Sequence, residues 1–160
     1  MIVVLMGVTG SGKTTVGKAL AANLGWKYLD ADEFHPATNI AKMRAGVALD
    51  DADRQPWLET LASLISDNIQ VGDSAVLACS ALKRIYRDKL SFSTEVRFVY
   101  LKGDRETIAE RLRNRRDHYM NPTLLDSQFE TLEEPTDALE INVMLPIDVI
   151  IQRIRTALKI

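Results

Sequence analysis

Near the start of the chain, an apolar run over Ile2–Met6 leads directly into Gly-Val-Thr-Gly-Ser-Gly-Lys-Thr at positions 7–14. This segment fits the pattern G-x-x-x-x-G-K-[ST], and it lies where the pattern requires, after a strand-like run and before a helix-like segment. Glycines let the backbone wrap closely around a phosphate, while backbone N–H groups and the following helix N-terminus attract negative charge. The sequence therefore predicts a phosphate-binding loop and, with it, a strand–loop–helix unit of an α/β fold.

Two positions of this loop have specific predicted tasks. Lys13 is expected to reach the β- and γ-phosphates of a nucleotide, and Thr14 to offer its hydroxyl to Mg²⁺. The alternative is a glycine-rich turn that matches by chance, which the flanking strand and helix disfavour. The glycines do not follow the G-x-G-x-x-G spacing of dinucleotide sites. The predicted nucleotide-binding residues of the loop are Gly7, Val8, Thr9, Gly10, Ser11, Gly12, Lys13, Thr14 and Thr15.

Composition narrows the class of protein further. The chain has 160 residues, 46% of them hydrophobic and 26% charged, with a formal net charge of −2. This length predicts one domain with an ordinary buried core, and the lack of a basic excess argues against nucleic-acid binding. The single cysteine, Cys79, excludes an internal disulfide and a multi-cysteine zinc site. Because the N-terminus does not resemble a secretory signal and no apolar run approaches roughly 18 residues, we expect a cytoplasmic protein with no membrane partner.

Apolar runs alternate with longer periodic segments along the chain, which is typical of a parallel sheet covered by helices. We expect a single doubly wound α/β domain over residues 1–160, with right-handed crossovers. The expected strands are 2–6, 26–29, 74–79, 96–101 and 139–144. Helices are expected from Lys13 to Gly25, over 39–45, from Asp53 with Pro56 in its first turn, over 83–90, from Asp104 to about 116, over 124–132 and from Pro146.

Two carboxylates, Asp30 and Asp32, follow the second expected strand. Residues at the carboxyl ends of parallel strands face the crevice where ligands bind. One carboxylate could support the Mg²⁺ shell while the other accepts the proton of an attacking hydroxyl, as phosphoryl transfer to an alcohol requires. The alternative is a solvated acidic loop that caps the next helix. The preceding phosphate loop favours the catalytic interpretation.

Basic residues near the expected crevice suggest an acidic acceptor. Arg54 lies among acids and either pairs with them or presents its guanidinium to a carboxylate, which arginine binds through two parallel hydrogen bonds. Lys83 follows the third strand at the crevice edge. Arg111 and Arg115 share one helix face before a polar segment, so one could stack on adenine while the other stabilises charge on the transferred phosphoryl group. A solvated basic helix end is the alternative for this pair.

Several short blocks together resemble the gluconate kinase family, within the wider group of shikimate- and nucleoside-monophosphate-kinase-like P-loop kinases. The resemblance covers nearly the whole chain. Departures from the family pattern occur at Ala31, at Ala48 and in the order Met120-Asn121-Pro122. The blocks that carry the resemblance are the loop at 7–14, D-A-D-E-F-H-P at 30–36, Asn39, Lys42-Met43, D-R-Q-P-W-L at 53–58, C-S-A-L-K at 79–83, Tyr86-Arg87, Y-L-K-G at 100–103 and S-Q-F-E-T-L-E at 127–133.

This resemblance implies transfer of the γ-phosphoryl group of ATP to the 6-hydroxyl of D-gluconate, giving 6-phosphogluconate and ADP. It also implies a three-layer P-loop domain whose five-stranded parallel sheet has the order 2-3-1-4-5, with a lid over about 115–133 and commonly a homodimer. In this assignment Lys13 and Thr14 hold phosphate and Mg²⁺, Asp32 is the base, and Asp30 supports the metal through water. Arg54 and Lys83 would hold the acid, Arg111 and Arg115 would serve the nucleotide, and His35, Arg87, His118 and Gln128 are further candidates for acceptor contacts.

Two other functions remain open from the sequence. The first is a related kinase with another acceptor, such as shikimate or a nucleoside monophosphate. Shikimate kinases typically carry a glycine triplet after the third strand, where this chain has Ala78-Cys79-Ser80. The second is a nucleotide-binding regulatory module without turnover. Intact Lys13, Thr14, Asp30 and Asp32 argue against that module.

Overall fold

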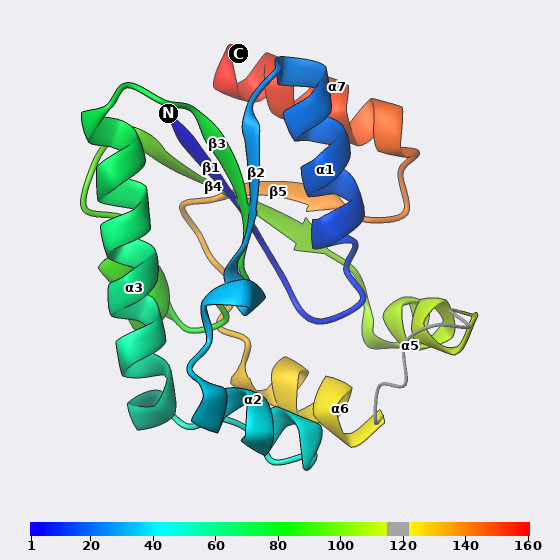
Figure 1. Ribbon diagram of the computed structural model, residues 1–160. Coiled ribbons are helices and arrows are strands. Elements are labelled where there is room, and N and C mark those ends of the chain that lie inside the picture. The colour runs from blue at the N-terminus through cyan, green and yellow to red at the C-terminus, as the bar shows by residue number, and fades with distance from the viewer. Residues whose placement is uncertain (115–121) are drawn as a thin grey trace.

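A computed structural model describes residues 1–114 and 122–160 of the chain. A parallel sheet with the strand order β2-β3-β1-β4-β5 forms the middle of three layers (Figure 1), which confirms the expected fold class and strand order. Its strands are β1 Ile2–Met6, β2 Lys27–Asp30, β3 Ala75–Ala78, β4 Val96–Lys102 and β5 Leu139–Asn142. Each lies within two residues of its expected bounds.

The helices divide between the two faces of the sheet and its carboxyl edge. Helices α1 Lys13–Leu24 and α7 Ile147–Leu158 cover one face, while α3 Asp51–Gln70 and α4 Arg84–Leu90 cover the other. The remaining elements lie beyond the carboxyl ends of the strands, in the lower half of Figure 1. They are the 3₁₀ helix η1 Ala31–Phe34, α2 Ala37–Arg44, α5 Arg105–Asn114 and α6 Pro122–Thr131.

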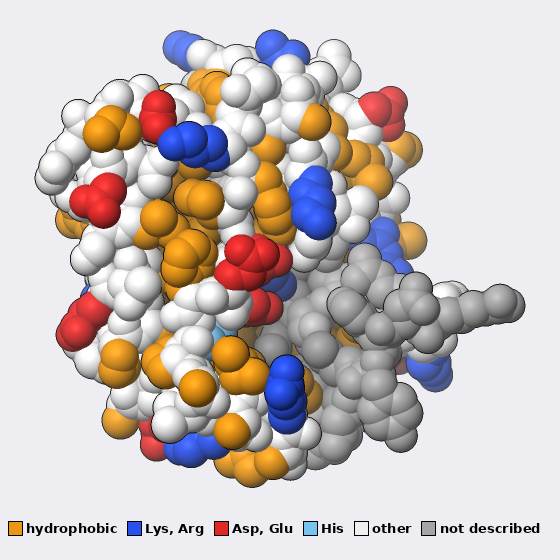
Figure 2. All heavy atoms as spheres, viewed as in Figure 1, with side chains coloured by type: hydrophobic (Ala, Val, Ile, Leu, Met, Phe, Trp, Pro, Cys, Tyr) orange, Lys and Arg blue, Asp and Glu red, His pale blue; other side chains and the backbone are white. Residues whose placement is uncertain are grey.

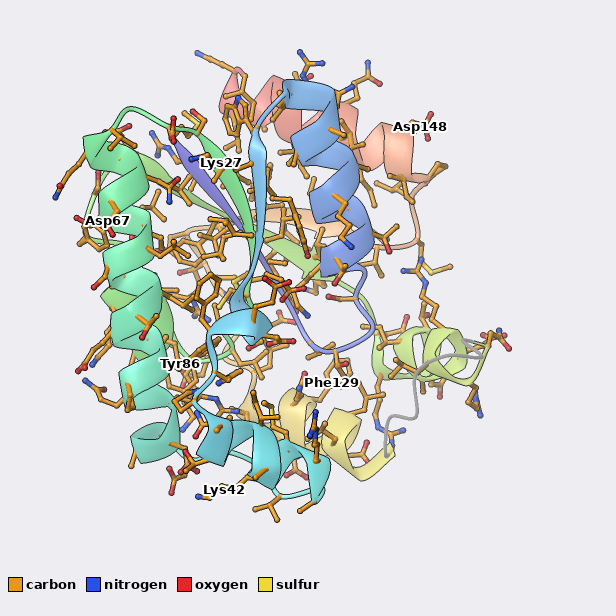
Figure 3. The ribbon with its side chains drawn as sticks, in the orientation of Figure 1. Lys27, Lys42, Asp67, Tyr86, Phe129 and Asp148 are labelled. Atoms are coloured by element: carbon orange, nitrogen blue, oxygen red, sulfur yellow. The ribbon has the colours of Figure 1, made fainter. Side chains whose placement is uncertain are left out.

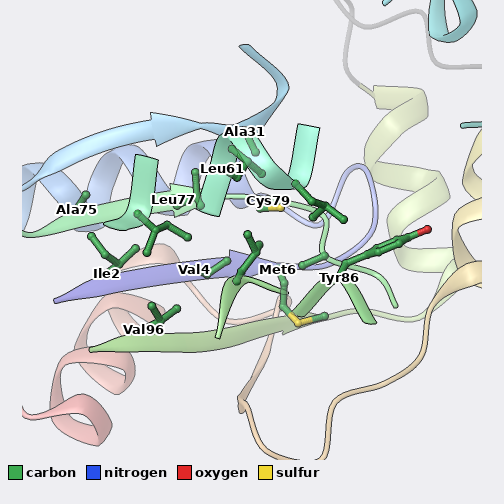
Figure 4. Packing of buried hydrophobic residues seen from close by; sticks show 14 of the residues in the cluster. Ile2, Val4, Met6, Ala31, Leu61, Ala75, Leu77, Cys79, Tyr86 and Val96 are labelled. Carbon is green, nitrogen blue, oxygen red and sulfur yellow. The ribbon is translucent and has the colours of Figure 1, made fainter. Parts of the chain in front are cut away.

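Strand β1 lies at the centre of the sheet and is fully buried on both faces. Ile2 and Val4 pack with Leu61 of α3 on one side (Figure 4), and Val3 and Leu5 pack against α1 and α7 on the other. A parallel sheet covered on both faces needs continuous apolar strands, so Ile-Val-Val-Leu-Met reads as an uninterrupted hydrophobic run. This central strand delivers the chain directly into the loop at 7–14.

Three local predictions need correction. Asp50, not Asp53, caps α3: its side chain accepts the Asp53 N–H at 2.7 Å, and the Asp53 carboxylate accepts the Asp50 N–H in return. Both carboxylates satisfy helix N–H groups by this reciprocal arrangement, so the helix begins earlier and Pro56 falls in its second turn. Helix α2 begins at Ala37, two residues earlier than expected, and η1 was not predicted at all.

Two other predicted helix boundaries, the end of α1 and the start of α5, are confirmed. Gly25 ends α1 with φ 67°, and the Asp104 side chain accepts the Thr107 N–H at the start of α5. Across residues 1–114 and 122–160, none of the helices has the length and apolar character needed to span a bilayer.

Candidate active site

A cavity of about 270 Å³ opens at the carboxyl ends of β1, β2 and β3. Figure 2 shows acidic side chains gathered around a hollow near the middle of this face, with basic side chains and a histidine close by. The lining comes from the loop at 7–14, from η1, from the segment joining α2 to α3, from α3 itself and from α6. The polar lining residues include Thr9, Lys13, Thr14, Asp30, Asp32, His35, Arg54, Ser80, Ser127 and Gln128.

The backbone of the loop at 7–14 adopts conformations that favour glycine. Gly7 has φ 145°, and a Cβ added there would lie 2.8 Å from the carbonyl oxygen of Leu101. Gly10 has φ 75°, and its added Cβ would lie 2.8 Å from the side chain of Leu112 on α5. The loop is therefore packed so closely against β4 at Gly7 and against α5 at Gly10 that neither position has room for a side chain.

The Lys13 ammonium is folded over this loop. Its Nζ donates to the carbonyl oxygens of Gly7 and Val8 at 2.9 and 2.8 Å. Desolvation lowers the Lys13 pKa, and the negative charge of Asp32 opposes that shift. The ammonium is thus held by neutral carbonyls at the place where the loop would receive phosphate oxygens.

Asp30 is held by its neighbours at the end of β2. One carboxylate oxygen accepts the Asp32 N–H at 3.1 Å and so caps η1, while the other accepts the Tyr28 hydroxyl at 3.2 Å. Burial raises the Tyr28 pKa to about 12, so this phenol stays a donor at neutral pH. Gly17 on α1 makes room for the Tyr28 ring, because a Cβ there would lie 2.7 Å from it. The carboxylate oxygens of Asp30 therefore have a fixed direction.

Asp32 lies one residue further and projects into the open cavity, with its side chain 81% exposed. Desolvation by the surrounding protein, and then the negative charge of Asp30, raise the Asp32 pKa. The positive charge of Lys13 lowers it. A raised pKa makes a carboxylate a stronger base. An exposed carboxylate beside the phosphate-binding loop is well placed to accept a proton from a bound hydroxyl.

The wall next to Asp32 is built around His35. Its ring stacks on Trp57 with the centroids 4.3 Å apart and the planes at 12°, and its side chain is only 5% exposed. Trp57 is anchored in turn, because its Nε1 donates to the carbonyl oxygen of Ala31 at 2.7 Å. Burial, then the positive charge of Arg54, lowers the His35 pKa from 6.5 to about 4. His35 is therefore neutral at neutral pH.

Arg54 supplies positive charge to the same cavity from α3. Its guanidinium donates to the carbonyl oxygen of Leu49 and to the Tyr86 hydroxyl, and it lies 5.4 Å from the centroid of the Tyr86 ring. A planar guanidinium held by a carbonyl and a ring is pre-organised to bind a carboxylate. The structure thus brings Lys13, Asp32, His35 and Arg54 together around one cavity.

Comparison with known proteins identifies the family. The sequence model of the shikimate kinase family matches residues 9–155. A probable gluconokinase of Xenopus tropicalis is 43% identical over 173 aligned positions, which cover 96% of this chain and 91% of that protein. The chain belongs to the gluconokinase family.

Two solved structures, one of them a gluconokinase, are also similar to this chain over most of its length. A gluconokinase from Sinorhizobium meliloti 1021 superposes with a TM-score of 0.84 at 40% identity, covering 94% of this chain and 86% of that one. A sugar kinase from Janibacter sp. HTCC2649 superposes with a TM-score of 0.92 at 42% identity, covering 99% and 94%. The family resemblance inferred from the sequence blocks is confirmed.

Two residues that the gluconokinase resemblance assigns to the acceptor do not line the cavity. Lys83 immediately precedes α4 and pairs with Asp51, with Nζ 2.7 Å from Oδ1. Arg87 is buried and donates to the carbonyl oxygens of Ala81 and Leu82, each at 3.0 Å. Ala81 has φ 43°, so Arg87 satisfies two buried carbonyls at a turn in left-handed backbone. Their substrate roles stay predictions.

The residues assigned to the lid of gluconokinases are only partly described. Gln128 on α6 lines the cavity, and its Oε1 accepts the Thr9 N–H at 2.6 Å, which ties α6 to the phosphate loop. Arg111 on α5 donates to the carbonyl oxygen of Val143 in the segment after β5. Arg115 and His118 lie outside the described residues.

Sequence reasoning overlooked several residues that shape the cavity. Tyr28 orients Asp30, Trp57 carries the His35 ring, and Asn39 is a buried amide whose side chain contacts His35. Both Asn39 and Trp57 belong to the family blocks, but the sequence assigns neither of them a contact with His35. No signal in the sequence pairs Asn39 with His35, because His35 lies in extended backbone before α2 begins.

Proposed function

We propose that this protein is a gluconokinase that transfers the γ-phosphoryl group of ATP to the 6-hydroxyl of D-gluconate, giving 6-phosphogluconate and ADP. One observation carries the proposal. The same cavity is lined by a phosphate-binding loop, by the exposed carboxylate of Asp32 and by the partly buried guanidinium of Arg54. The gluconokinases named among its relatives are similar over most of their length. An acidic polyol has the two groups that this cavity suits, a carboxylate at one end and a primary hydroxyl at the other.

In the proposed reaction, Arg54 binds the gluconate carboxylate and Asp32 receives the proton of the 6-hydroxyl. The bond between O6 and the γ-phosphorus forms as the bond from that phosphorus to the bridging oxygen of ADP breaks. Lys13 exchanges its carbonyl partners for phosphate oxygens and follows the negative charge that shifts toward ADP. We assign His35 and Gln128 to the acceptor side because both line the cavity.

Mg²⁺ is the metal that fits the donor set. The hydroxyl of Thr14 and the carboxylate of Asp30 are hard oxygen ligands, and Mg²⁺ is usually held by one or two carboxylates, waters and substrate phosphates. Within the described part of the chain, no cluster of three or more His, Cys, Asp or Glu side chains forms a metal cage. We assign Thr14 to direct contact and Asp30 to contact through water. When bound, Mg²⁺ would neutralise charge on the phosphates.

Further parts of the proposal rest on the family. We assign Thr15 and the rest of the loop at 7–14 to the phosphates, Arg111 and Arg115 to the nucleotide, and the segment at 115–133 to a lid that excludes water. His118, Lys83 and Arg87 stay predicted acceptor contacts. A homodimer and a cytoplasmic location are also proposals, and the second is based on the single cysteine, which is typical of a reducing compartment.

The test is a coupled assay of ADP release with Mg-ATP against gluconate, other aldonic acids, shikimate, glycerate, nucleoside monophosphates and no acceptor. Selective turnover with gluconate is the expected result. Turnover with shikimate instead would follow the matched family model and would overturn the acceptor assignment. Binding of ATP with no acceptor-dependent release of ADP would favour the regulatory module.

A further inference from the structure

A buried amide sits behind the His35 ring, on the side away from Asp32. Asn39 lies on α2 and is only 2% exposed. Its Nδ2 lies 2.8 Å from the carbonyl oxygen of Asp53 and 3.3 Å from His35 Nδ1. Buried polar groups are expected to satisfy their hydrogen bonds, so the direction of each of these contacts can be worked out.

The Asp53 carbonyl decides which way the Asn39 amide points. A carbonyl oxygen only accepts, so the side-chain atom next to it is the amide nitrogen. The second hydrogen of that nitrogen is then directed at His35 Nδ1, which must accept it. In a neutral imidazole only one nitrogen carries a proton, so the proton of His35 is on Nε2.

The anchor for this amide is itself fixed. The Asp53 carboxylate is held by Lys42 of α2, at 2.7 and 2.9 Å, and by the Asp50 N–H in the cap of α3. Figure 3 shows Lys42 on α2 at the lower edge of the molecule. Because α2 and α3 are joined at Asp53, the Asn39 amide has a defined position between them.

The opposite edge of the ring faces the proposed base. His35 Nε2 lies 3.9 Å from Asp32 Oδ1, which is longer than a hydrogen bond. The ring cannot swing away, because it is stacked on Trp57 and nearly fully buried. The Asp32 side chain is exposed and free to rotate, so a small rotation would bring its oxygen within reach of the Nε2–H.

We propose that Asn39 fixes His35 as the Nε2–H tautomer and that this N–H orients one oxygen of Asp32, leaving the other to receive the proton of the acceptor hydroxyl. Asn39 and His35 are thus positioning residues that act through Asp32. This inference rests on the proposed function, because it takes Asp32 as the base of a kinase reaction.

A neutral donor suits this task better than a charged one. An imidazolium beside Asp32 would favour the ionised carboxylate and weaken it as a base, whereas a neutral N–H orients the oxygen with less effect on basicity. A neighbouring charge favours the neutral form of the ring, because the Arg54 guanidinium opposes a positive charge on His35.

The tautomer can be read directly by ¹⁵N NMR of the imidazole in the full-length protein at about neutral pH. The His35 signals are those that disappear in His35→Gln. We expect Nδ1 to be unprotonated and Nε2 protonated in the wild type. In Asn39→Asp, whose carboxylate only accepts, we expect protonation at Nδ1. A wild-type ring protonated at Nδ1 would overturn the proposal whatever the activity of the protein.

Two substitutions of His35 separate orientation from packing. His35→Phe keeps an aromatic ring to stack on Trp57 but loses the donor, whereas His35→Gln loses the stack but places an amide N–H near Nε2. We expect kcat for gluconate to fall roughly tenfold or more in His35→Phe, with the KM for ATP unchanged, and to fall clearly less in His35→Gln. The reverse order would show that His35 is only a packing residue.

Unfolding curves of both variants show whether each still folds, and the NMR experiment does not depend on turnover. A wild-type protein that does not phosphorylate gluconate would refute the proposed function. An active wild type with equal kcat in His35→Phe and His35→Gln would refute only the positioning role.

Discussion

The two ends of the cavity are constructed differently. The phosphate end is made by the backbone of one short segment, residues 7–14, whose glycines pack against β4 and α5. The acceptor end is made by side chains that arrive from η1, α2, α3 and α6. A backbone site depends on local conformation, while a side-chain site depends on how distant elements pack. The two ends should therefore respond to different kinds of substitution.

The largest effect is expected at the junction of the two ends. Asp32→Asn keeps the size of the side chain but removes the base, so we expect kcat to fall by about 10²–10⁴-fold while ATP affinity is largely unchanged. Steady-state assays and ATP titration calorimetry check both quantities. Asp67→Asn, on the exposed surface of α3, is the matched control. Full activity of Asp32→Asn would show that Asp32 is not the base.

At the phosphate end, adding a methyl group should be enough to break the backbone site. Gly7→Ala combines a positive φ with a close contact to the Leu101 carbonyl, so we expect a loss of about 3 kcal/mol or more in the free energy of unfolding. Gly25 also has a positive φ but has no neighbour within 4 Å of its added Cβ. Gly25→Ala should therefore lose only about 1–2 kcal/mol. Equal losses in denaturant titrations would contradict the packing argument.

At the acceptor end, a change of side-chain geometry should affect the acceptor and spare the nucleotide. Arg54→Lys keeps the charge but cannot reproduce the planar donor set that contacts Leu49 and Tyr86. We expect the KM for gluconate to rise roughly tenfold or more, the size of one lost charge-assisted hydrogen bond. The KM for ATP should stay the same, and Arg153→Lys on α7 serves as the control. An equal rise in the KM for gluconate and the KM for ATP would contradict the separation of the cavity into a phosphate end and an acceptor end.

The smallest predicted effect is a dependence of stability on pH that belongs to the acceptor end. His35 has a pKa of about 4 in the folded protein against 6.5 ordinarily. Protonation therefore favours the unfolded chain, so the contribution of neutral His35 is complete above about pH 6.5 and declines as the pH falls toward 4.

Between about pH 7.5 and about pH 5.8, we expect the thermal midpoint of the wild type to fall by roughly 2–4 °C more than that of His35→Gln, the shift that about 1 kcal/mol produces in a domain of this size. Carboxylates titrate in both proteins and cancel in the difference. Parallel pH profiles would show that burial of neutral His35 contributes little to stability.

Much of the fold could be predicted from the sequence because its signals are local. The apolar run at 2–6, the loop at 7–14 and Gly25 each act through their own backbone or burial pattern, and the structure follows them. The start of α3 was misplaced because several acids precede it and each can cap a helix. Only the contact between Asp50 and Asp53 selects one of them.

The sequence by itself determined the phosphate loop, the pair Asp30 and Asp32, and the family, because each of these signals lies in the order of residues within short segments. The tertiary structure alone decided the surroundings of Asp32. It buried Asn39 against His35, placed that ring on Trp57, and directed Arg87 to backbone carbonyls while Arg54 lines the cavity. These outcomes depend on which helices meet at the carboxyl edge of the sheet, and side-chain hydrogen bonds between helices leave no periodic trace in the sequence.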